Sequence, residues 1–189
     1  MSAQDSKLFV ISGPSGAGKG TLVTRVRERR SNLGLTVSAT TRAPRKGEVD
    51  GVNYFFLTRK EFDRRVANGE FVEWAEVHGN CYGTLVSEVT SKLASGSSLI
   101  LEIDVQGALQ VKERFPEAVL IFIKPPSLEV LRDRLVGRGT ETPETIELRM
   151  ANAADELALA DRYDDVVVND DLDRATDELV RVLDMHERI

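Results

Sequence analysis

Short apolar runs recur along the chain and are separated by longer amphipathic stretches. The apolar runs span residues 8–11, 99–103, 119–123 and 166–168, and they predict buried strands, because a parallel sheet is covered on both faces. The amphipathic stretches predict helices over residues 21–30, 106–114, 128–135, 143–160 and 172–185. Strands that alternate with helices predict an α/β fold with three layers and a mostly parallel central sheet.

Two segments interrupt this alternation. Residues 38–96 are rich in glycine, charge and aromatics, with strand-like pieces at 54–57 and 71–77, and residues 125–162 are helical and densely charged. We interpret them as a substrate-binding lobe and a helical lid inserted into a single domain, since ligands bind at the carboxyl edge of such a sheet. The predicted core then comprises residues 1–37, 97–124 and 163–189.

Composition narrows the classes of partner. The formal net charge of −6 over 189 residues argues against nucleic acid or an anionic membrane surface as the main partner. A single cysteine excludes an intrachain disulfide, and no window has the length of apolar sequence that a membrane span or secretion signal needs. We therefore expect a cytoplasmic protein with small-molecule partners, and we favour a monomer.

The first apolar run leads into a phosphate-binding loop with the spacing G-x-x-x-x-G-K. Glycines let backbone amides converge on phosphate oxygens, the following helix presents its positive end, and Lys19 adds a charge. The strand before the loop and the helix after it favour this interpretation over an ordinary glycine-rich turn. The sequence therefore predicts a P-loop NTPase-type fold that binds ATP through Gly13, Pro14, Ser15, Gly16, Ala17, Gly18, Lys19, Gly20 and Thr21.

The loop departs from its usual pattern at one position. Ser or Thr ordinarily follows the lysine and binds Mg²⁺ through its hydroxyl, but here Gly20 follows Lys19, and Thr21 comes next. Mg²⁺ dehydrates reluctantly, so we expect phosphates and waters to hold it, with Thr21 as a candidate ligand.

Two arginines three residues apart indicate a second phosphate site. Arg42 and Arg45 flank a proline and follow several hydroxyl side chains, a pattern that suits a phosphate monoester through forked hydrogen bonds. A solvated basic turn is the alternative. Tyr54 lies beyond the next glycine-rich stretch and can donate its hydroxyl to the same phosphate or close a small core.

One carboxylate has the properties of a base reader. Alternation suggests that Glu73 lies on the opposite face of its strand from Phe71 and Trp74. A carboxylate accepts the two donors on one edge of guanine but repels the bare acceptor of adenine, so a single glutamate can discriminate between them. The alternative is an ordinary surface carboxylate.

Several independent motifs resemble those of guanylate kinase, in order and spacing. They are the loop at residues 13–19, the segments 38–45, 47–51 and 71–75, Tyr82-Gly83-Thr84, Asp104-Val105-Gln106-Gly107, the segment 137–142 and the segment 168–172. The resemblance spans nearly the whole chain and implies transfer of a phosphoryl group from ATP to GMP, with Mg²⁺.

The resemblance also implies roles for individual residues. By this resemblance, the GMP phosphate is bound by Ser38, Arg42, Arg45, Tyr54 and Tyr82. The guanine edge is bound by Glu73 and Thr84, and Asp104 lies beside the GMP site. Asn169 resembles a residue near the adenine pocket, although a helix cap explains it as well. The residues that would meet the transferring phosphoryl group are Lys19, Arg45 and the lid arginines Arg134, Arg138 and Arg149.

Two other functions compete with this one. Another small P-loop kinase, such as an adenylate kinase, fits Gly18-Lys19-Gly20-Thr21 but not the Arg42 segment or Glu73. A non-catalytic guanylate-kinase-like scaffold fits the fold, but such modules typically lose the phosphate loop, which this chain retains.

Overall fold

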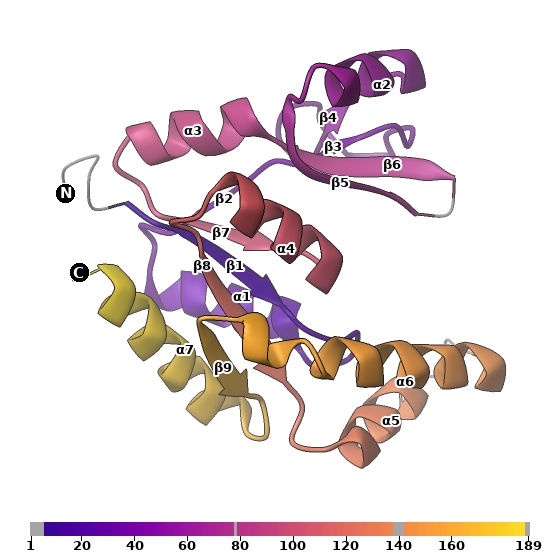
Figure 1. Ribbon diagram of the computed structural model, residues 1–189, viewed down its shortest axis with the longest axis vertical. Coiled ribbons are helices and arrows are strands. Elements are labelled where there is room, and N and C mark those ends of the chain that lie inside the picture. Colours follow the sequence, from indigo (N-terminus) through magenta and orange to yellow (C-terminus); the bar gives the residue numbers. More distant parts are fainter. Residues whose placement is uncertain (1–5, 78, 138–141, 188–189) are drawn as a thin grey trace.

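A five-stranded parallel sheet forms the centre of the protein, which is described by a computed structural model over residues 6–77, 79–137 and 142–187 (Figure 1). Its strand order is β2-β7-β1-β8-β9, and each neighbouring pair is parallel. This arrangement confirms the predicted α/β class. The strands are β2 (Gly34–Leu35), β7 (Leu99–Glu102), β1 (Leu8–Ser12), β8 (Val119–Lys124) and β9 (Asp165–Val168).

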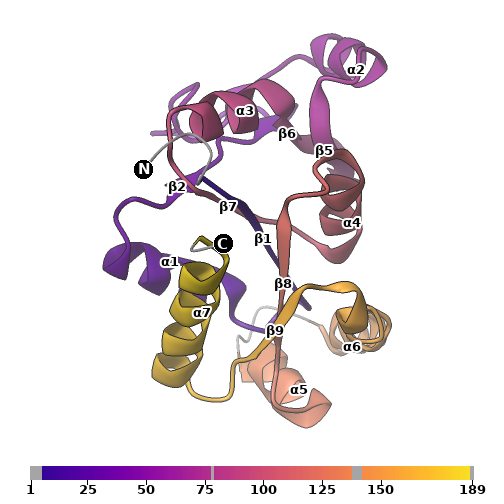
Figure 2. The same ribbon diagram turned by 60° about the vertical axis from the view of Figure 1, so that its left-hand side comes forward.

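Helices cover both faces of this sheet (Figure 2). In β1, Phe9 and Ile11 pack in the cluster that includes residues of α1 and α7, and Leu8 and Val10 pack in the cluster that includes residues of α3 and α4. These strands are uniformly apolar because both faces are buried. The helices are α1 (Lys19–Arg29), α7 (Leu172–Glu187), α3 (Val86–Ala94) and α4 (Val105–Arg114), and no helix in the described part of the chain is long and apolar enough to cross a membrane.

A second sheet lies beside the first and is built from the segment that was predicted to form an inserted lobe (Figure 1). Its strand order is β4-β3-β6-β5, and its own core contains Phe62, stacked on Phe71 with ring centroids 4.3 Å apart. The strand-like pieces predicted at 54–57 and 71–77 are present, whereas the strands β3 and β6 and the two helices in this segment were not predicted. The elements are β3 (Ala39–Thr40), β4 (Phe55–Phe56), α2 (Arg59–Ala67), β5 (Phe71–Val77) and β6 (Asn80–Leu85).

A β-bulge in β5 determines which way its side chains point. The register between β5 and β6 shifts between Phe71 and Glu73, so the intervening Val72 is an extra residue. Phe71 and Trp74 therefore both contact Phe62 in the lobe, while Val72 packs into the core beneath α4. Glu73 lies opposite the two aromatics, as predicted, but for Phe71 the reason given in the sequence analysis was wrong, because residues two apart in a regular strand share a face and only the bulge separates them.

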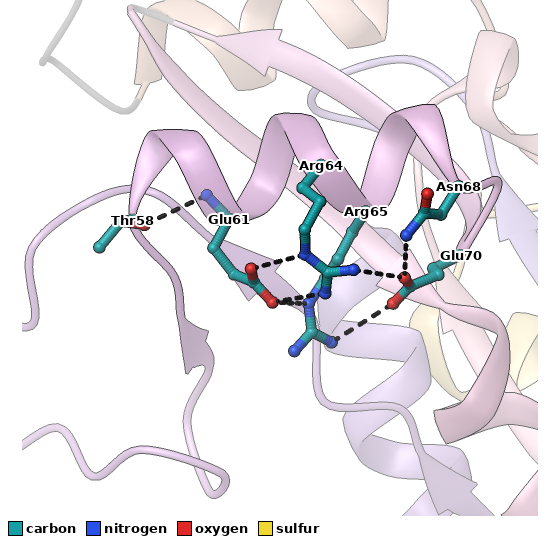
Figure 3. Close-up of polar contacts among 6 residues, drawn as sticks. All are labelled: Thr58, Glu61, Arg64, Arg65, Asn68 and Glu70. Carbon is teal, nitrogen blue, oxygen red and sulfur yellow. Dashed lines mark hydrogen bonds and ion pairs between the residues drawn. The ribbon is translucent and has the colours of Figure 1, made fainter.

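Helix α2 begins at a side-chain cap and carries a surface network of charges (Figure 3). Thr58 accepts a hydrogen bond from the Glu61 amide, which satisfies one of the free donors of the first turn. The Glu61 carboxylate binds Arg64 and Arg65, and these arginines hold its pKa down at about 2. Because these side chains are between 27% and 53% exposed, solvent screens the network and it contributes little to stability.

The lid follows the carboxyl end of β8 and consists of two helices packed together (Figure 1). Leu131 and Leu135 meet Ala153 in a small separate core. Thr142 caps the second helix, and Pro143 occupies its first turn, where the missing amide costs nothing. The elements are α5 (Leu128–Gly137), α6 (Pro143–Leu157) and the 3-10 turn η1 (Ala160–Arg162).

Candidate active site

The loop between β1 and α1 requires its glycines. Gly13, Gly16 and Gly18 have φ angles of 140°, 93° and 89°, which side chains rarely adopt. A Cβ built on Gly13 would also lie 2.2 Å from the carbonyl oxygen of Ile123 in β8. The loop therefore runs against the end of the neighbouring strand, where only glycine fits.

The end of this loop forms the start of α1. The helix begins at Lys19, two residues earlier than predicted, so Gly20 and Thr21 belong to its first turn. Gly18 is the N-cap and has no side chain to bond the first amides, which leaves them to an anion. The Lys19 Nζ donates to the carbonyl oxygens of Gly13 at 2.5 Å and Pro14 at 3.1 Å, and so spans the loop.

Asn169 fastens the loop to the sheet. Asn169 is buried, and its side-chain Nδ2 donates to the carbonyl oxygen of Ala17 at 2.8 Å. Its backbone N–H donates to the carbonyl oxygen of Lys124 in β8. A Cβ on Gly18 would lie 2.4 Å from this Nδ2. Asn169 thus supports the conformation of the loop directly, whichever part of a nucleotide lies beside it.

The lid arginines reach this loop from the other side. Arg134 donates to the carbonyl oxygen of Asn169 at 2.8 Å, and Arg149 donates to the Ser15 hydroxyl at 2.6 Å. The third predicted lid arginine, Arg138, lies outside the described residues. Between lid and loop lies a cavity of about 500 Å³, whose lining includes Gly16, Gly18, Thr21, Arg134, Asn169 and Leu172.

Three of the predicted acceptor-phosphate residues, Arg42, Tyr54 and Tyr82, lie close together. Arg42 lies 5.4 Å from the ring centre of Tyr54, and Tyr54 meets Tyr82 edge to face at 6.2 Å. The pKa of Arg42 is raised chiefly by its hydrogen bond with Glu48, with a smaller contribution from Tyr82. Arg45 lies three residues after Arg42 and is exposed. Ser38 lies just before β3, and its carbonyl oxygen accepts a hydrogen bond from the Phe55 amide.

The predicted base-reading pair faces each other across two strands. Glu73 in β5 pairs with Thr84 in β6, and only 8% of Glu73 is exposed. Burial raises the pKa of Glu73, and Asp104 adds to this, whereas Thr84 acts in the opposite direction. The Thr84 Oγ1 is buried and makes no hydrogen bond of normal geometry with any described residue. The site therefore contains a buried carboxylate next to a buried hydroxyl.

Asp104 lies next to this pair at the carboxyl end of β7. It caps α4, and its Oδ1 accepts a hydrogen bond from the Gly107 amide at 2.8 Å. A Cβ on Gly107 would lie 3.5 Å from Glu73 Oε2, so this glycine leaves room for the carboxylate. The cavity here, of about 370 Å³, is lined by Glu73, Asp104, Gly107 and Glu156, among others.

Three carboxylates at the site were not among the predicted ligands. Glu48 accepts a hydrogen bond from Arg42. Glu102 faces Gly20, and a Cβ built on Gly20 would lie 3.5 Å from Glu102 Oε1. Glu156 comes from the lid; burial raises its pKa, and Lys19 opposes this. Glu48 lies within a motif that was visible in the sequence, whereas the only sequence signal for Glu156 is its position on a charged helix.

Comparison with known proteins identifies the family. The family model described as "Guanylate kinase" matches residues 5–186. The guanylate kinase of Gloeobacter violaceus is 56% identical over 178 residues, which are 94% of this chain and 87% of the relative. That of Halalkalibacterium halodurans is 51% identical over 183 residues, covering 97% of this chain and 90% of the relative.

A solved structure agrees with these relatives. The crystal structure of guanylate kinase from Anaplasma phagocytophilum has a TM-score of 0.72 and 36% identity, and covers 96% of this chain and 86% of its own. Sequence and fold point to one assignment, and this chain belongs to the guanylate kinase family.

Proposed function

We propose that this chain is a guanylate kinase enzyme, which transfers the γ-phosphoryl group of ATP to GMP and yields ADP and GDP. The observation that carries the proposal is the buried pair of Glu73 and Thr84 beside the carboxyl edge of the parallel sheet. Both relatives named above are guanylate kinases, and this chain matches most of the length of each.

The pair matches the hydrogen-bonding edge of guanine. N1–H and the 2-amino group supply donors for the Glu73 carboxylate, and O6 supplies an acceptor for the Thr84 hydroxyl. Adenine would instead place its N1 acceptor against the carboxylate, leaving a buried charge unpaired, which is costly. The phosphate of GMP would lie against Arg42, Arg45, Tyr54 and Tyr82, with Ser38 beside them.

The loop and lid supply the groups for transfer. Phosphoryl transfer depends on positioning and on electrostatic stabilisation, not on covalent chemistry by the protein. The first-turn amides of α1 and Lys19 would hold the triphosphate of ATP, and Arg134, Arg138 and Arg149 would neutralise charge on the moving group, together with Arg45. Closure of lobe and lid excludes water, which would otherwise hydrolyse ATP.

We also propose that Mg²⁺ accompanies ATP. No group of three or more His, Cys, Asp or Glu side chains in the described residues is arranged to hold a metal ion. Two side-chain oxygens beside Lys19 come from Thr21, in the first turn, and from Glu102, which faces Gly20. Oxygen atoms suit Mg²⁺, and phosphates and waters would complete its coordination. When bound, Mg²⁺ neutralises charge on the β- and γ-phosphates.

A panel of acceptors tests the proposal. The purified protein with ATP and Mg²⁺ should phosphorylate GMP much faster than AMP, CMP or UMP, measured by ADP release and product chromatography. Preference for AMP would instead support an adenylate kinase, and failure to bind ATP would support a scaffold.

Two variants of neighbouring carboxylates sharpen this test. Glu73→Gln should lower kcat/KM for GMP by about 10²-fold and reduce the preference for GMP over AMP, because the amide cannot accept both donors. Glu76→Gln is the control, since Glu76 lies on the same strand but is exposed and bonds Arg59. Equal effects of the two substitutions would count against base reading by Glu73.

A further inference from the structure

The turn that carries both predicted phosphate-binding arginines is closed by one carboxylate. Glu48 accepts hydrogen bonds from Arg42 Nη2 at 2.8 Å through Oε1 and at 3.0 Å through Oε2. Its Oε2 also accepts from the backbone amide of Arg45 at 2.6 Å. Each carboxylate oxygen therefore has a donor from this turn, and one side chain links the two arginines.

This link is part of a packed structure and not a loose surface pair. Only 15% of the Arg42 side chain and 19% of the Glu48 side chain are exposed. The guanidinium lies over the rings of Tyr54, at 5.4 Å, and Phe56, at 5.9 Å, and its Nη1 donates to the carbonyl oxygen of Ala43. A charge-assisted hydrogen bond in such a partly buried setting fixes geometry far better than an exposed one.

We propose that Glu48 is a positioning residue for the acceptor phosphate. It holds the Arg42 guanidinium in place and, through the Arg45 amide, sets the course of the backbone that presents the Arg45 side chain. A phosphomonoester then meets two arginines that are already oriented, so less conformational entropy is lost on binding. This inference rests on the proposed function, because it takes the phosphate of GMP as the group that the arginines bind.

The direction in which GMP affinity changes when Glu48 is neutralised distinguishes positioning of the arginines from simple charge repulsion. A carboxylate close to a phosphate site repels the ligand, so neutralising Glu48 should tighten GMP binding if charge alone mattered. If Glu48 instead positions the arginines, its neutralisation should weaken GMP binding. The two accounts predict opposite results from one substitution.

The test compares Glu48→Gln with Glu61→Gln. Glu61 is a matched control because it lies in the same lobe, also binds two arginines, and makes its contacts within α2 (Figure 3). Calorimetry with GMP should show affinity lowered about tenfold by Glu48→Gln, the loss that corresponds to about 1.4 kcal/mol, and little change from Glu61→Gln. Guanosine, which lacks the phosphate, should bind both variants as it binds the unmodified protein.

Each outcome decides between the accounts. Unchanged or tighter GMP binding by Glu48→Gln would overturn the inference, and so would an equal loss of guanosine affinity, which would indicate general damage to the lobe. Failure of the unmodified protein to bind GMP would instead refute the proposed function. Should Glu48→Gln not fold, Glu48→Asp keeps the charge but shortens the reach, and the same loss with GMP and not guanosine is expected.

Discussion

At the scale of single residues, the site depends on a few atoms that leave no room for substitution. Gly18 shows this most clearly, because its backbone is left-handed and its missing Cβ makes room for the Asn169 amide. The same amide bonds Ala17, so the shape of the phosphate loop and the identity of residue 18 are coupled.

Gly18→Ala should therefore impair ATP binding beyond its effect on backbone strain. The left-handed conformation alone costs about 1–3 kcal/mol for a residue with a side chain. Gly79→Ala measures that cost separately, since Gly79 has a φ of 77° and a Cβ there would meet nothing within 4 Å. Thermal unfolding should show both losses, and calorimetry with ATP should show weaker binding only for Gly18→Ala. Equal ATP affinity in the two variants would contradict this account.

At the scale of elements, the lobe is joined to the core chiefly where β5 lies against α4. Val72 packs into the core from the bulge, and Arg114, at the end of α4, donates to the carbonyl oxygens of Phe71 and Gly69. These contacts lie just before Glu73 in the chain, so the join between the two units also helps to position the predicted base reader.

Arg114→Met should loosen this join and raise KM for GMP by roughly tenfold, because two charge-assisted hydrogen bonds are lost. KM for ATP should change little, since the phosphate loop is on another element. Lys112→Met is the control, because Lys112 is in the same helical turn and bonds Ala118 and Asp164 within the core. Steady-state kinetics with each substrate varied would settle the matter, and parallel rises in both KM values would contradict the prediction.

The elements also show how far the sequence alone could lead. The strands of the main sheet were predictable because their two-sided burial makes them continuously apolar, and the phosphate loop because its chemistry needs glycine and lysine at fixed spacing. Helix α2 was missed although Thr58 and Glu61 have the spacing of a capping box.

Other features depend on tertiary structure and leave no local pattern. The two-residue strands β3 and β4 exist only through their pairing, and the bulge at Val72 appears only when β5 meets β6. Simple alternation therefore gives the right side for Glu73 relative to Trp74 and the wrong one relative to Phe71. The Glu48 carboxylate could be noticed in the sequence, but not its bonds to Arg42 and Arg45.

At the scale of the whole molecule, several of the predicted site groups follow strands at one edge of the parallel sheet. The phosphate loop follows β1, Asp104 follows β7, the lid follows β8 and Asn169 follows β9 (Figures 1 and 2). Carboxylates are consequently crowded near this edge, and burial raises the pKa of both Glu73 and Glu156. Burial of these carboxyls in their charged form costs stability.

The pH dependence of stability should reveal this cost. A carboxyl with a raised pKa in the folded state binds more protons than in the unfolded chain, so its contribution makes the protein less stable as pH rises through the window above 4.5. Glu73→Gln should therefore raise the melting temperature at neutral pH, by about 2–4 °C for each kcal/mol relieved. The gain should shrink below the unfolded pKa, and a melting temperature lowered at neutral pH would contradict the prediction.

The bulge at Val72 has an implication for how this lobe can change over evolutionary time. Because one extra residue separates Phe71 from Glu73, the strand changes its reading frame at that point, and every later side chain exchanges faces. Deleting Val72 would restore simple alternation, with Phe71 and Trp74 still toward the lobe and Glu73 still toward the acceptor. The chain can therefore shorten by one residue at this position without exchanging the carboxylate for the indole, and the loss is confined to the contact of Val72 with the core.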